Sequence, residues 1–99
     1  VSGACLLVRR VDAEAVGYFD KRFFMYIEDV DFCAAIRSRQ RRILFTPASE
    51  VQHIRGQSVA TAPKDTALAY RRSQLAFYDK HHPFWAPILR SYLRFCRRI

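Results

Sequence analysis

The sequence predicts an α/β fold in which short mixed strands are flanked by helices. Three short segments, at residues 4–9, 43–46 and 50–54, are predicted as strands, and longer segments with helical periodicity lie between and after them. The chain has 99 residues, about the size of one small domain, and 51% of them are hydrophobic, which is enough for a core.

The first half begins with the buried strand at 4–9. Asp12 is predicted as the N-cap of a short helix that ends at Gly17. Residues 18–27 show no clean period and are predicted as an aromatic loop. A helix follows from about residue 29 to 39, and the side chains expected on one of its faces are Val30, Cys33, Ala34 and Arg37.

The second half begins with the strands at 43–46 and 50–54, which Pro47 separates. Residues 55–63 contain Gly, Ser, Thr and Pro and are predicted as a loop. A long helix is expected from residue 64 or 65 to about 81, where Pro83 prevents its continuation.

A last helix is expected from about residue 84 to 98, with an apolar stripe and a basic side. A basic amphipathic helix is able to lie on an anionic membrane surface, but it is equally able to pack on its own domain with a solvated arginine face. The stripe consists of Trp85, Ile88, Leu89, Tyr92, Leu93, Cys96 and Ile99.

Composition limits the class of protein and its partners. The formal net charge of +8 favours binding of phosphates, whether of nucleotides, nucleic acids or lipid head groups. Cys5, Cys33 and Cys96 form no CxxC pair and have apolar neighbours, so we expect buried, reduced thiols in a cytosolic protein.

Three carboxylates lie within four residues, at Glu28, Asp29 and Asp31, directly after an aromatic run. Partial desolvation by aromatic neighbours raises the pKa of a carboxyl group, which suits a general base. The same cluster also fits an ordinary helix N-terminus, where acidic residues are favoured by capping and by the helix dipole.

Several motifs occur in one order along about residues 1 to 82. Together they closely resemble the C-terminal half of family 2 glycosyltransferases of the GT-A fold, especially bacterial rhamnosyltransferase-like members. The motifs are Val1–Arg10, Gly17–Asp20, Phe23–Asp31, Pro47, His53–Ser58 and Arg72–His82.

The resemblance implies the C-terminal portion of a GT-A domain. Residues 1–63 would form its acceptor-side and catalytic half, and residues 64–99 a C-terminal helical extension. The chain begins at Val1, inside an expected strand, so we expect a piece of a longer protein that lacks the nucleotide-binding half. On this interpretation the fragment alone is inactive.

The resemblance further implies an inverting transferase in which Asp29 is the general base. Glu28 would orient the acceptor or the base. The expected acceptor-binding residues are Gly3, Ala4, Tyr26 and Asp31, although Asp31 also fits a structural role in which it holds a basic neighbour.

In many enzymes of this fold a histidine after the strand that corresponds to residues 50–54 joins the metal site, which here implies His53 as a ligand for Mn²⁺ or Mg²⁺. The main ligands would come from an Asp-x-Asp motif before Val1, so the fragment alone is not expected to hold the metal. A lone histidine in a strand is also commonly a core or surface residue without a ligand.

The implied partners are a nucleotide-sugar donor and a glycan or lipid-linked acceptor, with bacterial cell-envelope polysaccharide assembly as the pathway. The C-terminal basic helix would contact the inner face of the cell membrane, and a surface left by the missing half would allow a homo-oligomer. The alternative is a non-enzymatic basic module that binds anionic membrane or nucleic acid, but no nucleic-acid motif supports it.

Three further positions carry expectations. Asp20 is predicted as a turn-forming residue, whose side chain bonds nearby backbone. The basic residues Lys80 and His81 either approach a phosphate or form a solvated face. The resembled family usually has a glycine near the position of Gln40, where it ends the preceding helix in a left-handed turn. This sequence lacks that glycine, so the helix cap is in doubt.

Overall fold

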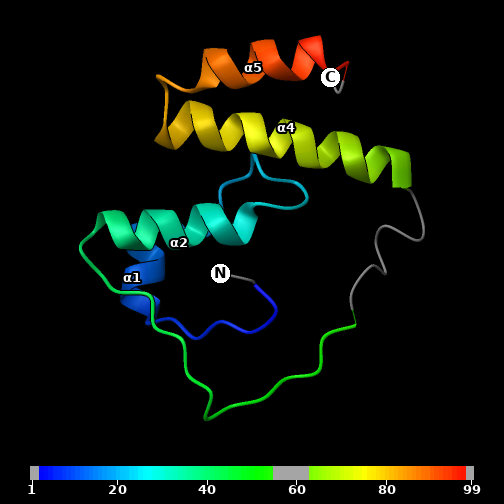
Figure 1. Ribbon diagram of the computed structural model, residues 1–99. Coiled ribbons are helices and arrows are strands. Elements are labelled where there is room, and N and C mark those ends of the chain that lie inside the picture. The colour runs from blue at the N-terminus through cyan, green and yellow to red at the C-terminus, as the bar shows by residue number, and fades with distance from the viewer. Residues whose placement is uncertain (1–2, 55–62, 98–99) are drawn as a thin grey trace.

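The computed structural model describes residues 3–54 and 63–97, and the regular elements within these ranges are helices (Figure 1). The expected helices near 29–39, 64–81 and 84–98 are present, with ends shifted by up to three residues. The bounds are α1 Arg10–Ala15, α2 Glu28–Ser38, α4 Pro63–His81 and α5 Ala86–Phe95.

Helices α2, α4 and α5 lie one above another, with α4 in the middle (Figure 1). The colours show that α2 and α4 run in the same direction, whereas α5 runs back along α4 after a short turn. Because parallel neighbours need a long connection, the chain leaves α2 and passes outside the helices through residues 39–54 before α4 begins.

Two small sets of buried apolar side chains lie among these helices. Ala13 of α1 packs with Phe32 and Ile36 of α2, and the ring of Phe19 lies 4.9 Å from that of Phe32. Between α4 and α5, the buried side chains of α5 are Ala86 and Leu93. The short α1 and the hairpin of α4 and α5 are therefore each fixed by a few buried residues.

The predicted α/β fold is wrong for the part of the chain that the structure describes, because residues 4–9, 43–46 and 50–54 form no strand there. These segments are irregular and mostly exposed, with Leu7, Leu44 and Phe45 facing solvent. A short apolar run has strand propensity, but a strand exists only when a neighbouring strand completes its hydrogen bonds. The sequence pattern detects the first condition and not the second.

Asp12 does not cap α1, contrary to the prediction. The N-cap is Arg9, and Asp12 lies inside the helix with its side chain buried. The Nε–H of Arg41 donates to Oδ1 of Asp12 at 2.9 Å, which satisfies the buried carboxylate. Asp12 therefore ties α1 to the segment after α2.

The turn after α2 is left-handed even though it lacks glycine. Gln40 has φ 63°, directly after the C-cap Arg39, and its N–H donates to the carbonyl of Arg37. A polar residue in this conformation costs more than glycine does, but helix ends tolerate it. The departure from glycine therefore leaves the end of α2 intact.

The three cysteines differ in burial. Cys33 is buried as expected, and burial raises the pKa of its thiol. Cys5 is exposed and Cys96 is half-buried, so the expectation of buried thiols is wrong for Cys5. All three are free thiols.

A bilayer crossing would require a long apolar helix, and none is found among residues 3–54 and 63–97.

Leu93→Ala is expected to lower the free energy of unfolding by about 2–4 kcal/mol, because Leu93 is only 1% exposed and its removal leaves a cavity between α4 and α5. Urea unfolding followed by circular dichroism measures the change. Leu44→Ala is the matched control, since Leu44 is 75% exposed and its truncation should cost less than about 0.5 kcal/mol. Equal losses in the two variants would contradict the packing described for α5.

Candidate active site

The candidate active site lies at the N-terminal end of α2, where a strained turn positions the acidic cluster. Tyr26 and Ile27 both have left-handed backbones, with φ 64° and 66°. This conformation is unfavourable for any residue with a side chain and especially for a β-branched one such as Ile27. The turn brings the chain abruptly into α2, so Glu28, Asp29 and Asp31 all fall in the first helical turn.

Contacts with α4 hold the strained turn. The hydroxyl of Ser73 donates to the carbonyl of Met25 at 2.9 Å, and Ser73 is buried. The ring of Tyr26 meets that of Tyr70 edge to face, with centroids 5.9 Å apart. These contacts from α4 offset part of the cost of the left-handed residues.

The Asp29 carboxylate is fixed by two backbone N–H groups. Oδ2 accepts a hydrogen bond from the N–H of Gly3 at 2.5 Å, and Oδ1 accepts one from the N–H of Val30 at 2.8 Å. The structure thus brings together Gly3 and Asp29, which are 26 residues apart in the chain. Asp29 is half-buried.

Gly3 is required for this approach. A Cβ atom at Gly3 would lie 2.8 Å from the Cβ of Asp29 and 3.1 Å from its Oδ2, closer than non-bonded atoms tolerate. The adjacent Ala4 is exposed in the same segment. The absence of a side chain at Gly3 therefore permits close contact with the candidate base.

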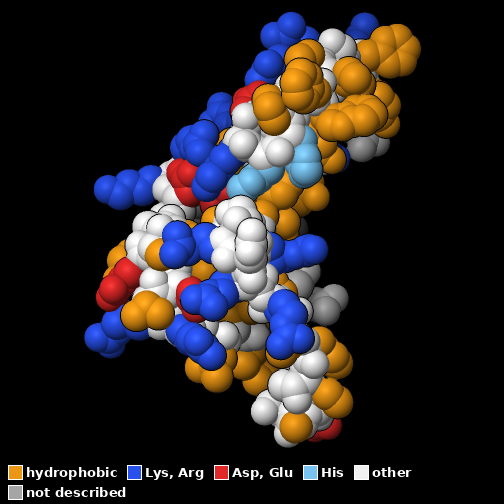
Figure 2. Space-filling model, turned by 90° about the vertical axis from the view of Figure 1, so that its left-hand side faces the viewer, with side chains coloured by type: hydrophobic (Ala, Val, Ile, Leu, Met, Phe, Trp, Pro, Cys, Tyr) orange, Lys and Arg blue, Asp and Glu red, His pale blue; other side chains and the backbone are white. Residues whose placement is uncertain are grey.

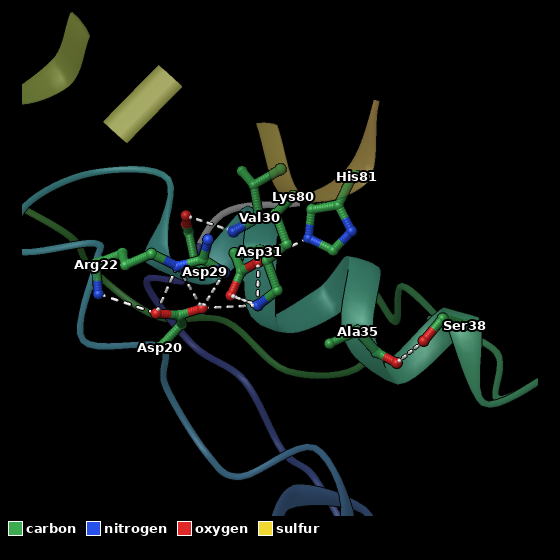
Figure 3. A network of polar contacts seen from close by, with 9 residues as sticks. All are labelled: Asp20, Arg22, Asp29, Val30, Asp31, Ala35, Ser38, Lys80 and His81. Atoms are coloured by element: carbon green, nitrogen blue, oxygen red, sulfur yellow. Dashed lines mark hydrogen bonds and ion pairs between the residues drawn. The ribbon is translucent and has the colours of Figure 1, made fainter. Parts of the chain in front are cut away.

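Glu28 and Asp31 occupy different environments from Asp29. Oε2 of Glu28 is buried, and among the described residues it has no hydrogen-bond partner. Asp31 is 1% exposed, and its Oδ1 lies 2.8 Å from Nζ of Lys80 and 2.7 Å from Nε2 of His81. These contacts fit the structural alternative for Asp31, in which it holds a basic neighbour (Figure 3).

Lys80 also contacts the loop before α2. Its Nζ lies 3.0 Å from Oδ2 of Asp20, so one ammonium group bridges the carboxylates of Asp20 and Asp31 (Figure 3). Partial burial alone would lower the pKa of Lys80, but hydrogen bonds to Asp31 and Asp20 raise it overall. We call Asp20, Arg22, Asp31, Lys80 and His81 the clamp.

Asp20 has the turn-forming role predicted for it. Its Oδ1 accepts a hydrogen bond from the N–H of Arg22 at 2.9 Å, and its carboxylate pairs with the Arg22 guanidinium at 2.8 Å. Side-chain and backbone hydrogen bonds from Arg22, with a smaller contribution from Lys80, hold the pKa of Asp20 well below its usual value.

Sequence reasoning did not pair Lys80 and His81 with Asp31. These side chains were expected to approach a phosphate or to face solvent. The residues that meet are 49 and 50 positions apart, and no local pattern connects them. The one available signal was Asp31 itself, the third carboxylate of the cluster, for which the sequence already offered a structural role beside a basic residue.

His53 lies in the extended segment after α2, where its side chain is exposed. Among residues 3–54 and 63–97, no three His, Cys, Asp or Glu side chains are grouped so that they would hold a metal ion. The described residues therefore do not by themselves fit a metal centre, and the role of His53 stays a prediction.

Comparison with known proteins finds curated relatives along nearly the whole chain. It is 38% identical, over 95% of its length, to the N-acetylglucosaminyl-diphospho-decaprenol L-rhamnosyltransferases of two Mycobacterium tuberculosis strains, CDC 1551 / Oshkosh and ATCC 25618 / H37Rv. It spans 31% of the length of each.

A more distant match covers 58% of the chain, at 33% identity, and 18% of the low-salt glycan biosynthesis hexosyltransferase Agl10 of Haloferax volcanii. No protein-family model matches the chain. No solved structure matches it either.

Asp31→Asn is expected to lower the free energy of unfolding by about 1–3 kcal/mol, because Lys80 and His81 lose the buried carboxylate between them. Thermal and urea unfolding measure the loss. Asp79→Asn is the matched control, since Asp79 pairs with Arg90 at an exposed position and should cost at most about 1 kcal/mol. A larger loss in Asp79→Asn would show that the clamp does not stabilise the contact between α2 and α4.

Acid should weaken the protein through Asp20. Because the pKa of Asp20 is lower in the folded than in the unfolded protein, its stabilising contribution is complete above the unfolded value of about 3.9 and is lost as pH falls toward the folded value. Asp20→Asn should therefore show a smaller loss of stability between about pH 5 and pH 2 than the wild type. Parallel acid dependence in the two proteins would contradict the assigned pairing.

Proposed function

Because this chain is homologous over 95% of its length to curated rhamnosyltransferases, we propose that it is the acceptor-side part of an inverting glycosyltransferase of family 2. The enzyme moves a sugar from a nucleotide-sugar donor to a hydroxyl of a glycan or lipid-linked acceptor. The names of the Mycobacterium tuberculosis relatives support a lipid-linked acceptor, since they describe transfer of L-rhamnose to an N-acetylglucosaminyl-diphospho-decaprenol.

The observation that carries the proposal is the fixed carboxylate of Asp29. In the proposed reaction, Asp29 takes the proton of the acceptor hydroxyl as that oxygen bonds to the anomeric carbon. The bond from that carbon to the nucleotide diphosphate breaks at the same time, and its electron pair leaves with the diphosphate. The N–H groups of Gly3 and Val30 hold the carboxylate in one orientation, which favours proton transfer along a defined path.

The neighbouring carboxylates fit this task less well. Asp31 is almost fully buried and engaged with Lys80 and His81, so it is not accessible to an acceptor. Glu28 has one buried oxygen and is assigned to orienting the acceptor or the base. Asp29 is half-buried, and each of its oxygens keeps a lone pair that the described backbone bonds do not use.

The acceptor is proposed to enter beside the segment that contains Gly3 and Ala4. Tyr26 lies on the strained turn next to the acidic cluster, where its half-buried ring is suitable for contact with a sugar. A divalent metal, Mn²⁺ or Mg²⁺, remains part of the proposal because the chain resembles glycosyltransferases that use one. No catalytic step is assigned to it, because the described residues do not form its site.

Asp29→Asn in the full-length enzyme is expected to reduce sugar transfer by about 10²-fold or more, because the nearly isosteric amide does not accept the acceptor proton. Transfer is measured with radiolabelled donor, and donor binding, measured in parallel, should be unchanged. Gly3→Ala should also reduce kcat, since its Cβ would displace the Asp29 side chain.

Glu28→Gln removes the neighbouring carboxylate, which is assigned to orientation and not to proton transfer, so it should reduce transfer less than Asp29→Asn does. A wild-type rate in Asp29→Asn, with a large loss in Glu28→Gln, would transfer the role of base to Glu28. A loss of donor binding in Asp29→Asn would instead remove the support for a base at this position.

A further inference from the structure

Lys80 joins the two ends of the segment that carries the proposed base. Its Nζ lies 3.0 Å from Oδ2 of Asp20, in the loop before α2, and 2.8 Å from Oδ1 of Asp31, in the first turn of α2. Asp29 lies between these two anchors in the sequence, two residues before Asp31. One ammonium group therefore holds both ends of the stretch from residue 20 to residue 31 against the last turn of α4 (Figure 3).

Lys80 is not needed simply to give either carboxylate a partner. Asp20 already pairs with the Arg22 guanidinium at 2.8 Å, and Asp31 already lies 2.7 Å from Nε2 of His81. Cations are also abundant, because the chain has 17 Lys and Arg residues against 9 Asp and Glu, and Figure 2 shows many basic and few acidic side chains on one face. What Lys80 adds is a link between two carboxylates, which the described contacts of Arg22 and His81 do not provide.

The ammonium group of Lys80 is itself held in place by a buried aromatic ring. It lies 5.9 Å from the centre of the Phe23 ring, within the range of a cation–π interaction, and Phe23 is only 6% exposed. The N–H of Phe23 donates to the carbonyl of Asp20 at 3.1 Å, so the ring and the first anchor belong to the same turn. Lys80 is therefore a fixed point for the loop as well as for α2.

The link acts on the first turn of α2, where the proposed base lies. The N–H of Asp31 donates to the carbonyl of Ile27 at 2.8 Å, so holding Asp31 also holds the strained turn. A rotation of this helix end would move the Asp29 carboxylate away from the N–H of Gly3, to which it is hydrogen-bonded. A displacement of about 1 Å at a reacting group is able to lower a rate by roughly 10²-fold. The orientation of the first turn is therefore a condition for proton transfer.

We propose that Lys80 is a positioning residue for sugar transfer. By tying Asp20 to Asp31, it holds the first turn of α2 so that the Asp29 carboxylate faces the acceptor hydroxyl. Lys80 acts through Asp29 and not on the reacting atoms. The inference rests on the proposed function, because it concerns the orientation of the proposed base, and it gives the last turn of α4 a part in transfer.

Sugar transfer by the full-length enzyme tests the inference when Lys80→Met is measured in both the wild-type and the Asp29→Asn backgrounds. In the wild-type background, Lys80→Met should lower kcat by about tenfold and leave KM for the donor within about twofold. In the Asp29→Asn background it should cause less than about a twofold further loss, because the orientation of the base no longer matters once the base is removed. Lys64→Met removes an exposed lysine at the other end of α4 and is the matched control, which should transfer at the wild-type rate.

Asp20→Asn cuts the same link from its other end and keeps the inference testable if Lys80→Met does not fold. The amide oxygen still accepts the N–H of Arg22, as Oδ1 does now, but the amide nitrogen in place of Oδ2 does not accept from Lys80. The contacts of Lys80 and His81 with Asp31 are left in place. Asp20→Asn should lower kcat by about threefold or more, and again only when Asp29 is present.

The two backgrounds separate a positioning role from a structural one. An unchanged kcat in both Lys80→Met and Asp20→Asn would overturn the inference. So would a loss of equal size in the wild-type and Asp29→Asn backgrounds, because a lysine that only stabilises the fold affects both alike. A wild-type rate in Asp29→Asn alone is a different result, which contradicts the proposed base and removes the inference with it.

Discussion

A carboxylate that is almost completely removed from water must be met by positive charge or hydrogen-bond donors, and the structure around Asp31 satisfies that constraint. Lys80 and His81 come from the last turn of α4 to meet it, and Lys80 reaches Asp20 in the loop before α2. Three segments that are distant in the chain are thereby placed at one point. The buried charge is costly to form, but its pairing specifies how α2 lies on α4.

The candidate base depends on this placement. Asp29 is two residues from Asp31 on the same helix, so the clamp that fixes Asp31 also fixes the helix turn that presents Asp29. Contacts of Ser73 and Tyr70 with the strained turn add a second constraint from α4. The carboxylate of Asp29 is then oriented by the N–H of Gly3, which lies outside both α2 and α4. A long helix with no assigned chemistry thus supports the residue that is proposed to react.

Local patterns in the sequence predicted the helices and the acidic cluster, because helical periodicity and capping act over a few residues. They did not predict whether an extended apolar run has a partner, so the strands expected at 4–9, 43–46 and 50–54 were wrong. They also missed the pairing of Asp31 with Lys80 and His81. The sequence predicted that Gly3 permits close approach of another group, but it did not identify that group as Asp29, which is 26 residues away.

The long connection between α2 and α4 has a consequence for the order of folding. The ion pair of Arg90 with Asp79 joins residues 11 positions apart, whereas that of Lys80 with Asp31 spans 49. Closing the longer loop costs about 1.3 kcal/mol more chain entropy, since each doubling of loop length adds about 0.6 kcal/mol. We therefore expect the hairpin of α4 and α5 to form ahead of the contact with α2, and the proposed catalytic end of α2 to be completed late, against a preformed support.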